Sequence, residues 1–429
     1  MTPIAIFTRK ELMQRIPTSV TLWGGVMLFL SGLSWSAQAA DFSLKQLLEI
    51  AVVKHPSVLQ AKSQAQAAGF DVEAAQWGRY PSVSSELRSD TNLTQSLAKV
   101  EQPLWTGGKL TSRIELSEAN MRAAQAGIHE AQFTALTQVA SAYFEVLRLE
   151  QRHKHASLNV TEHERLVALI QRRSQAEISP PADTTLAQAR LQQAVSERIQ
   201  IKKQLDAALT TLAQWTVPLT GGLKAPADVP FARAPDALLL ERVMVNSPQR
   251  KRLQSQIDSA EAQINVNKSQ IYPTVVAGFQ HTWAGQVPTS TDRNKAYLAL
   301  QFQSGAGLSA RSGMQAAVSR KDAAQQELET LDRNLQSQIQ AAITELDALQ
   351  AQLDPAKALL AGTTEVVESY LRQYQVGRKN WLDVLNAQRE KTQALNNLAD
   401  MQYGHQLAKV RLMIQSGDIS AQQLSALHD

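Results

Sequence analysis

Apolar residues three and four positions apart recur through most of this chain. This rhythm predicts helices over residues 43–77, 109–175, 183–215, 236–271, 309–375 and 381–415. Two of the runs, 109–175 and 309–375, have 67 residues each, which is about 100 Å of straight helix. Helices of that length do not fit inside a globular core, so the pattern predicts helices packed along one another in long apolar seams.

Two prolines fall inside the helical pattern. Pro56 predicts a kink or break about a third of the way along 43–77, because proline removes a helix hydrogen bond and clashes with the preceding turn. Pro355 predicts a bend in the run 309–375 for the same reason.

Between the helical runs the apolar period changes to two, which predicts strands within 82–105 and 274–302. The second stretch is the clearer one, since every second residue from Val275 to Trp283 falls on one side. In the first stretch, the spacing places Leu104 on the same side as Val100. The four strands have one apolar and one polar face, as in membrane barrels, and Trp105 and Trp283 are candidates for the aromatic girdles. A small soluble sheet has the same alternation, so the strands alone favour neither interpretation.

The chain repeats this plan once. Asp183, Ala187 and Gln188 recur as Asp383, Ala387 and Gln388 at a shift of about 200 positions, and Tyr80-Pro81 recurs as Tyr272-Pro273 at a shift of about 192. The repeat predicts two halves of similar structure joined by a proline-rich linker. The expected segments are a first repeat at 40–216, the linker at 217–235, a second repeat at 236–416 and a C-terminal tail at 417–429.

A tight turn is expected between the last two helices. Gly377 suits the left-handed position that ends a helix, and Asn380 suits the N-cap of the next one. The counterpart turn after residue 175 has Ala176 and Glu177 in place of a glycine.

The first 39 residues have the features of an export signal. Basic residues precede an apolar run from Leu22 to Leu33, and Ala37-Gln38-Ala39 forms a cleavage site with small residues. The apolar run is about a dozen residues, and a membrane-spanning helix needs about 20. We therefore expect cleavage after Ala39 and export of the remaining chain.

Composition narrows the possible functions. There is no cysteine, which excludes disulfides, thiolate metal sites and an N-terminal lipidated cysteine. The formal net charge is only +4, so nothing suggests nucleic acid as a partner. Glu150 and His153 have the spacing of one half of a carboxylate metal site, but the second half is missing. No catalytic constellation stands out, and we expect neither an enzyme nor a cofactor.

Four strands cannot span a membrane alone. Their two open edges would leave backbone groups without hydrogen bonds in hydrocarbon, at several kcal/mol per group. If the strands face lipid, several copies of the chain must close a barrel together.

The doubled plan, the two Tyr-Pro junctions, the Gly-Gly after Leu104-Trp105-Thr106 and the Val-Gly-x5-Asp-Val-Leu-x-Ala-Gln motif from Val376 resemble the TolC-like outer-membrane efflux and secretion channels. The resemblance implies a mainly α fold with a small membrane β-barrel part. It implies a homotrimer with an α-helical tunnel in the periplasm and a 12-strand barrel, four strands per protomer, in outer-membrane lipid. The implied partners are a periplasmic adaptor, or membrane fusion protein, and an inner-membrane transporter of the ABC or RND type.

The resemblance also assigns roles at the periplasmic aperture. The assigned residues are Asp383 and Asn386 at the pore constriction, Tyr374, Asp183 and Lys379 in the hydrogen bonds of the gate, and Glu177, Ile178, Gly377 and Arg378 at the adaptor-docking hairpin ends. Arg172 and Arg173 are further candidates for a basic docking tip, although a charge pair is most often a solvated surface.

The cargo is the open question. Gly305-Ala306-Gly307-Leu308-Ser309 resembles channels that serve type I secretion of adhesins, and efflux of drugs or metals is the alternative. A different class of protein, an exported coiled-coil scaffold without a pore, would have no use for two strand hairpins with matching apolar faces.

Overall fold

The computed structural model describes residues 41–421 with gaps at 91–92, 219–220, 227–228, 232, 285–292 and 303–308. The expected export signal, residues 305–308 of the secretion motif and the last eight residues of the tail lie outside the described residues. The helices are α1 (Leu44–Lys54), α2 (Pro56–Trp77), α3 (Lys109–Gln175), α4 (Pro181–Trp215), α5 (Asp236–Asn246), α6 (Pro248–Ser269), α7 (Ser309–Gln375) and α8 (Trp381–Ser416). The strands are β1 (Ser82–Asp90), β2 (Leu93–Trp105), β3 (Thr274–Ala284) and β4 (Asn294–Gln301).

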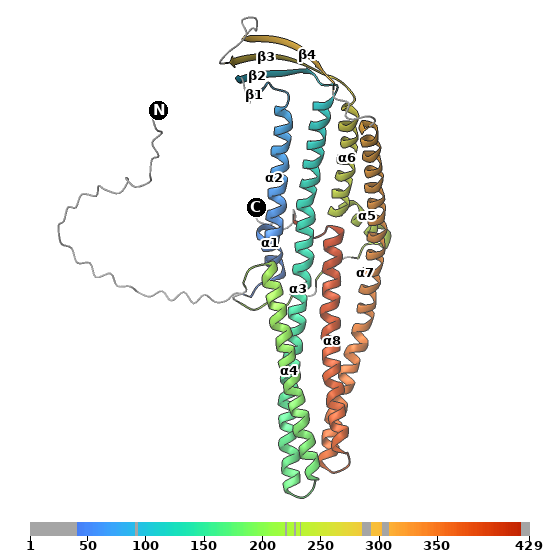
Figure 1. The fold of residues 1–429 in the computed structure, drawn as a ribbon. Helices are drawn as coiled ribbons and strands as arrows, with labels where there is room; N and C mark the ends of the chain where they lie inside the picture. The colour runs from blue at the N-terminus through green and yellow to red at the C-terminus, as the bar shows by residue number, and fades with distance from the viewer. Residues whose placement is uncertain are drawn as a thin grey trace, which may run out of the picture. The chain divides into compact units, whose positions relative to one another are not determined.

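The elements follow one plan twice. Two short helices lead into a strand hairpin, a 67-residue helix and a return helix of 35 or 36 residues. The strands lie at one end of the long helices, and the α3–α4 and α7–α8 hairpins lie at the other end (Figure 1). The predicted fold, with mainly long helices and a small strand region, is confirmed.

The short helices of both repeats are interrupted before a proline. The break predicted at Pro56 is confirmed, because α1 ends at Lys54 and α2 begins at Pro56. The prediction of one helix over 236–271 was wrong, because α5 ends at Asn246 and α6 begins at Pro248. Proline disfavours the helical region for the residue before it, and Ser247 lies outside that region with a ψ of 116°. Helix α7 continues on both sides of Pro355, and the bend there stays a prediction.

The four strands form one antiparallel sheet in the order β1-β2-β3-β4. The register places Val83 opposite Val100 and Val100 opposite Phe279, so these side chains share one face. Val275 pairs with Leu300 and belongs to the same face, which confirms the predicted alternation in β3 and β4. Val83, Phe279 and Leu300 are exposed in the single chain.

A β-bulge near the end of β2 changes the face of the sheet on which Trp105 lies. Pro103 pairs with Val276, and Trp105 pairs with Val275, so Leu104 is the extra residue. The bulge turns Trp105 to the face of Val100 and Val275. The expectation that Leu104 also shares this face stays a prediction, because both bulged residues lie opposite one partner. Trp105 and Trp283 now lie on one face of the sheet.

The opposite face has a polar cluster that bridges three strands. The Tyr297 hydroxyl donates to Glu101 Oε1 at 2.8 Å, and Lys99 Nζ lies 2.6 Å from the same oxygen. Gly278 lies between Glu101 and Tyr297 in the register, and a Cβ there would lie 2.3 Å from the tyrosine ring. The glycine therefore lets Tyr297 cross over β3 and reach β2.

The two long helices differ in how much of their surface is covered. Helix α3 packs against α2 and α4 of its own repeat and against α6 and α8 of the other. Helix α7 packs mainly against α5, α6 and α8. Eighteen residues of α3 are buried, against eight of α7 at equal length. Much of α7 is therefore left uncovered in a single chain.

The largest apolar cluster lies where α1 meets the middle of α3, with α4 and α8 beside it. Phe42 forms a bridge with Leu223 of the linker, and the buried Tyr143 donates its hydroxyl hydrogen to the Lys224 carbonyl. The linker is thus attached to the helices midway between the strands and the hairpins.

Candidate functional site at the helix hairpins

The two hairpin turns have the same backbone geometry. Residues 176–180 connect α3 to α4, and residues 376–380 connect α7 to α8. In each turn an amide reaches back five residues, from Ile178 to the Arg173 carbonyl and from Arg378 to the Gln373 carbonyl, both at 2.9 Å. This bond defines a Schellman motif, in which one residue must be left-handed.

Different residues take the left-handed position in the two turns. Gly377 has φ of +79°, and Glu177 has φ of +56° and is the one non-glycine residue with positive φ among the described residues. The predicted C-cap at Gly377 is confirmed, and so is the N-cap, since the Asn380 side chain accepts from the Leu382 amide at 3.2 Å. In the first turn, Pro181 starts the next helix without a side-chain cap.

Reciprocal substitutions should measure this backbone strain. Glu177→Gly is expected to stabilise the first hairpin by about 1 kcal/mol, because a left-handed conformation costs a non-glycine residue roughly that much. Gly377→Ala should destabilise the second hairpin by a similar amount, since the added Cβ meets open space and only strain remains. Amide hydrogen exchange of the two turns is the measurement. Equal exchange in both variants and the parent would contradict the strain assignment.

Contacts between the first and second hairpins centre on Tyr374, which is buried. The Arg173 guanidinium lies 4.8 Å from the centre of the Tyr374 ring, and its Nη1 donates to the Gln375 carbonyl at 3.2 Å. The Tyr374 hydroxyl lies 3.5 Å from Ser179 Oγ, and the buried Trp381 ring lies beside the tyrosine at 5.8 Å. The two hairpins of one chain are therefore attached to each other near their ends.

The three residues assigned to the gate lie near the contact between the two hairpins, but they do not form one hydrogen-bonded group in the described part of the chain. In the described part of this chain, the hydrogen-bonding neighbour of Tyr374 is Ser179, whereas Asp183 lies in the first turn of α4 without a bond to it. Lys379 pairs with Asp383 at 3.4 Å and lies 4.2 Å above the Tyr370 ring. The lysine therefore partly neutralises the carboxylate assigned to the constriction.

The residues assigned to docking lie at the exposed tips, where Ile178 is 62% exposed and Glu177, Gly377 and Arg378 are exposed as well. Arg173 was considered only as part of a basic tip, yet it lies against the second hairpin. Ser179 and Trp381 were not predicted. Trp381 is one of only seven tryptophans and follows directly after a helix cap, and this could have marked it as an anchor.

The seam between α3 and α8 is polar above the hairpins. Asn159 Oδ1 accepts from Gln388 Nε2 at 3.2 Å and from Thr392 Oγ1 at 3.1 Å, and Gln388 and Thr392 are buried. Further from the hairpins, Arg148 donates to Asp400 at 2.9 Å. Glu145 first and Asp400 second raise the pKa of the Arg148 guanidinium, so the guanidinium is charged at every physiological pH.

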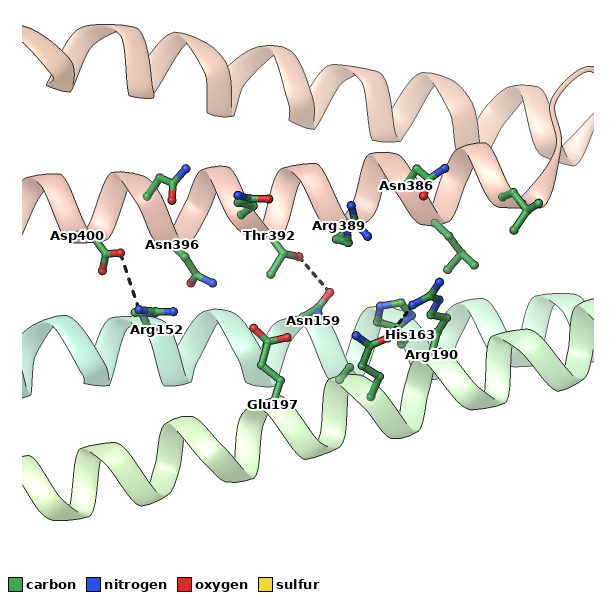
Figure 2. A pocket seen from close by; sticks show the side chains of 16 residues that line it. Arg152, Asn159, His163, Arg190, Glu197, Asn386, Arg389, Thr392, Asn396 and Asp400 are labelled. Atoms are coloured by element: carbon green, nitrogen blue, oxygen red, sulfur yellow. Dashed lines mark hydrogen bonds and ion pairs between the residues drawn. The ribbon is translucent and has the colours of Figure 1, made fainter.

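Asn386, assigned to the constriction, lines a groove of about 420 Å³ beside this seam (Figure 2). Side chains from α3, α4 and α8 form the groove. Among the residues that the structure describes, no three His, Asp or Glu side chains gather as metal ligands do. Nor does any described helix contain a stretch both long and apolar enough to cross a membrane.

The sequence matches the outer membrane efflux protein family over residues 47–216 and 239–417. These segments cover well over half of the chain, so it belongs to this family. The protein is accordingly an efflux channel of the outer membrane, with its helical part in the periplasm, and it acts as a passive duct and not as an enzyme.

Two relatives and one solved structure illustrate the similarity. The chain is 26% identical over 307 residues to the cobalt-zinc-cadmium resistance protein CzcC of Cupriavidus metallidurans, covering 70% of this chain and 71% of the relative. It is 25% identical over 333 residues to the nickel-cobalt-cadmium resistance protein NccC of Alcaligenes xylosoxydans, covering 71% and 70%. The outer membrane protein VceC of Vibrio cholerae has the same fold, with a TM-score of 0.73, 17% identity and coverage of 87% and 96%.

Proposed function

We propose that three copies of this chain close a 12-strand barrel in the outer membrane and continue as an α-helical tunnel into the periplasm. The observation that carries the proposal is the open sheet. Among the described residues, β1 pairs with β2 alone and β4 with β3 alone, which leaves both outer edges available to neighbouring copies. Hydrocarbon cannot satisfy unpaired backbone groups, so an apolar sheet of this kind requires further strands at both edges.

The height of the apolar face supports a membrane location. Trp105 lies opposite Val275, and Trp283 lies eight residues further along β3. At about 3.3 Å per residue, the two indole rings are about 26 Å apart along the strand. Strands of membrane barrels tilt by about 35–45°, so this separation corresponds to about 20 Å of height, close to the apolar band of about 25 Å that aromatic girdles flank. The uncovered surface of α7 supports the same trimer, since a neighbouring copy would cover it.

In this assembly the hairpins form the periplasmic aperture. Asp383 and Asn386 of three copies surround the constriction, and the exposed tips at Glu177, Ile178, Gly377 and Arg378 face a periplasmic adaptor driven by an inner-membrane transporter. In the closed aperture, we propose that Asp183 bonds Tyr374 of a neighbouring copy.

Charge at the constriction gives the first functional test. Asp383→Ala is expected to reduce the preference of the channel for cations, because it removes an acidic ring from the narrowest point. Lys379→Ala should increase that preference, since Lys379 neutralises Asp383 in the present arrangement. Reversal potentials in planar bilayers under a salt gradient measure both effects. An unchanged reversal potential in both variants would place the constriction elsewhere.

The hairpin contact gives a second test. Tyr374→Phe combined with Asp183→Ala is expected to raise single-channel conductance, because each lost hydrogen bond weakens closure by about 0.5–1.5 kcal/mol per copy and three copies act together. Thr210→Val on the exposed surface of α4 is the matched control and should leave conductance unchanged. Conductance that stays at the parent level in the double variant would show that other residues hold the aperture closed.

Two candidates for the exported cargo are each supported by one observation. The first candidate cargo is divalent transition-metal cations. It is supported by the similarity to CzcC and NccC, whose names state resistance to cobalt, cadmium, zinc or nickel. Secreted adhesins of type I systems are favoured by the Gly305–Ser309 motif after the last strand. Deleting the gene separates them. Greater sensitivity to cobalt, zinc and cadmium would support metal efflux, and loss of a large protein from the cell surface or medium would support secretion. A deletion that raises only drug sensitivity would overturn both.

A further inference from the structure

The groove beside the α3–α8 seam has an uneven distribution of charge. At the end nearer the hairpins, the groove is lined by Arg190 from α4 and His163 from α3, which lie side by side in Figure 2, and by Arg389 from α8. Asn386 lies at the same end. Helices α4 and α8 belong to different hairpins, so a ligand bound here would contact both.

The two arginines are not neutralised by carboxylates. Arg190 donates from Nη1 to the neutral Gln193 amide oxygen at 2.7 Å. Within the part of the chain that the structure describes, Arg389 forms no ion pair. Each guanidinium therefore retains donors for a ligand, and a guanidinium pairs especially well with oxyanions because its donors form a planar fork.

The acidic residues of the groove lie toward its other end. Asp400 is engaged by Arg148 at 2.9 Å and by Arg152 at 3.8 Å. Glu197 lies between Arg152 and Asn159 in Figure 2, whereas Arg190 and His163 lie beyond Asn159. The end near the hairpins is thus the cationic one.

His163 adds a polar group and little charge. Burial first, and the Arg190 guanidinium second, lower the pKa of the imidazole below its ordinary value of 6.5. The ring is therefore neutral at pH 7 and offers one N–H donor.

We propose that this end of the groove binds a small oxyanion of the phosphate or sulfate type, with Arg190 and Arg389 as the charged ligands and His163 as a neutral donor. The groove, at about 420 Å³, has room for such an ion together with water. A bound oxyanion would connect α8 to α3 and α4, and so connect one hairpin to the other. The channel could then respond to the anion concentration of the periplasm at a site away from the constriction.

Titration calorimetry with inorganic phosphate tests this on the full mature protein in detergent at pH 7. The expected result is saturable binding of phosphate. Chloride keeps the ionic strength constant during the titration, so the binding is not an effect of ionic strength. Arg389→Gln and Arg190→Gln should each lower phosphate affinity at least about tenfold, since each removes a charge-assisted hydrogen-bond pair. Glu197→Gln should raise the affinity a few-fold, because it removes a carboxylate that lines the same groove.

Arg333→Gln is the matched control, because Arg333 lies on α7 and pairs with Glu329 on its own helix. It should bind phosphate as the parent does. Gel filtration of each variant checks that assembly is retained, and Arg389→Lys should recover part of the affinity if charge is what matters. Absence of saturable binding in the parent, or equal affinity in parent and Arg389→Gln, would overturn the proposal and leave the export function untouched.

Discussion

Phe279→Arg is expected to prevent most of the protein from reaching the assembled trimer. Phe279 lies four residues from Val275, which pairs with Trp105, and four residues from Trp283, so it is halfway between the proposed girdles. An arginine facing lipid at mid-bilayer costs about 2–4 kcal/mol, and a trimer carries three of them. The expected loss of trimer is about tenfold or more, measured as heat-resistant oligomer in outer-membrane extracts.

Gln301→Arg is the control with the same added charge on the opposite, polar face of the sheet. Gln301 pairs with Thr274, one position from the Val275–Leu300 pair, so its side chain points away from the lipid side. It should assemble normally, because a side chain facing the lumen remains in water. Equal loss of trimer in the two variants would contradict the proposed orientation of the sheet, and normal assembly of Phe279→Arg would contradict a barrel in lipid.

Gly107→Ala is expected to be the most damaging of the conservative substitutions. Gly107 has φ of +60°, and an added Cβ would lie 2.3 Å from Cβ of Tyr272. That atom belongs to the backbone end of the tyrosine and cannot rotate away. Strain of about 1–2 kcal/mol and overpacking of about 1–3 kcal/mol together predict a loss of about 2–5 kcal/mol. Thermal unfolding followed by circular dichroism in detergent measures the effect.

Two other glycines separate the contribution of backbone strain from that of overpacking. Gly108 has φ of +85° with open space around its Cβ position, so Gly108→Ala should cost only the backbone strain. Gly127 lies within α3 with open space, and Gly127→Ala should stabilise by about 0.5–1 kcal/mol. If Gly107→Ala and Gly108→Ala were equally damaging, the contact with Tyr272 would have no energetic role.

The contact at Gly107 also shows where sequence reasoning about the site ends. The Gly-Gly after Trp105 and the Tyr272-Pro273 junction are both visible in the sequence as breaks between helices and strands. That one packs against the other could not be deduced, because about 165 residues separate them and no local rule fixes such a pairing. Arg173 and Tyr374 are a second case. Each is an ordinary helix residue in its own repeat, and they meet only because the two hairpins lie side by side.

Local periodicity was sufficient to predict most of the helices and strands of this protein. Both 67-residue helices, the four strands and the caps at Gly377 and Asn380 follow from spacing and from the conformations that glycine and asparagine allow, and these are short-range effects. The break at Ser247 was also within reach, since Pro248 disfavours the helical region for it. The strand order, the bulge that turns Trp105 to the apolar face, the central place of α3 and the cationic end of the groove depend on contacts between residues far apart in the chain. Only the folded structure decides those, because packing selects one among many arrangements that the same helices and strands would locally permit.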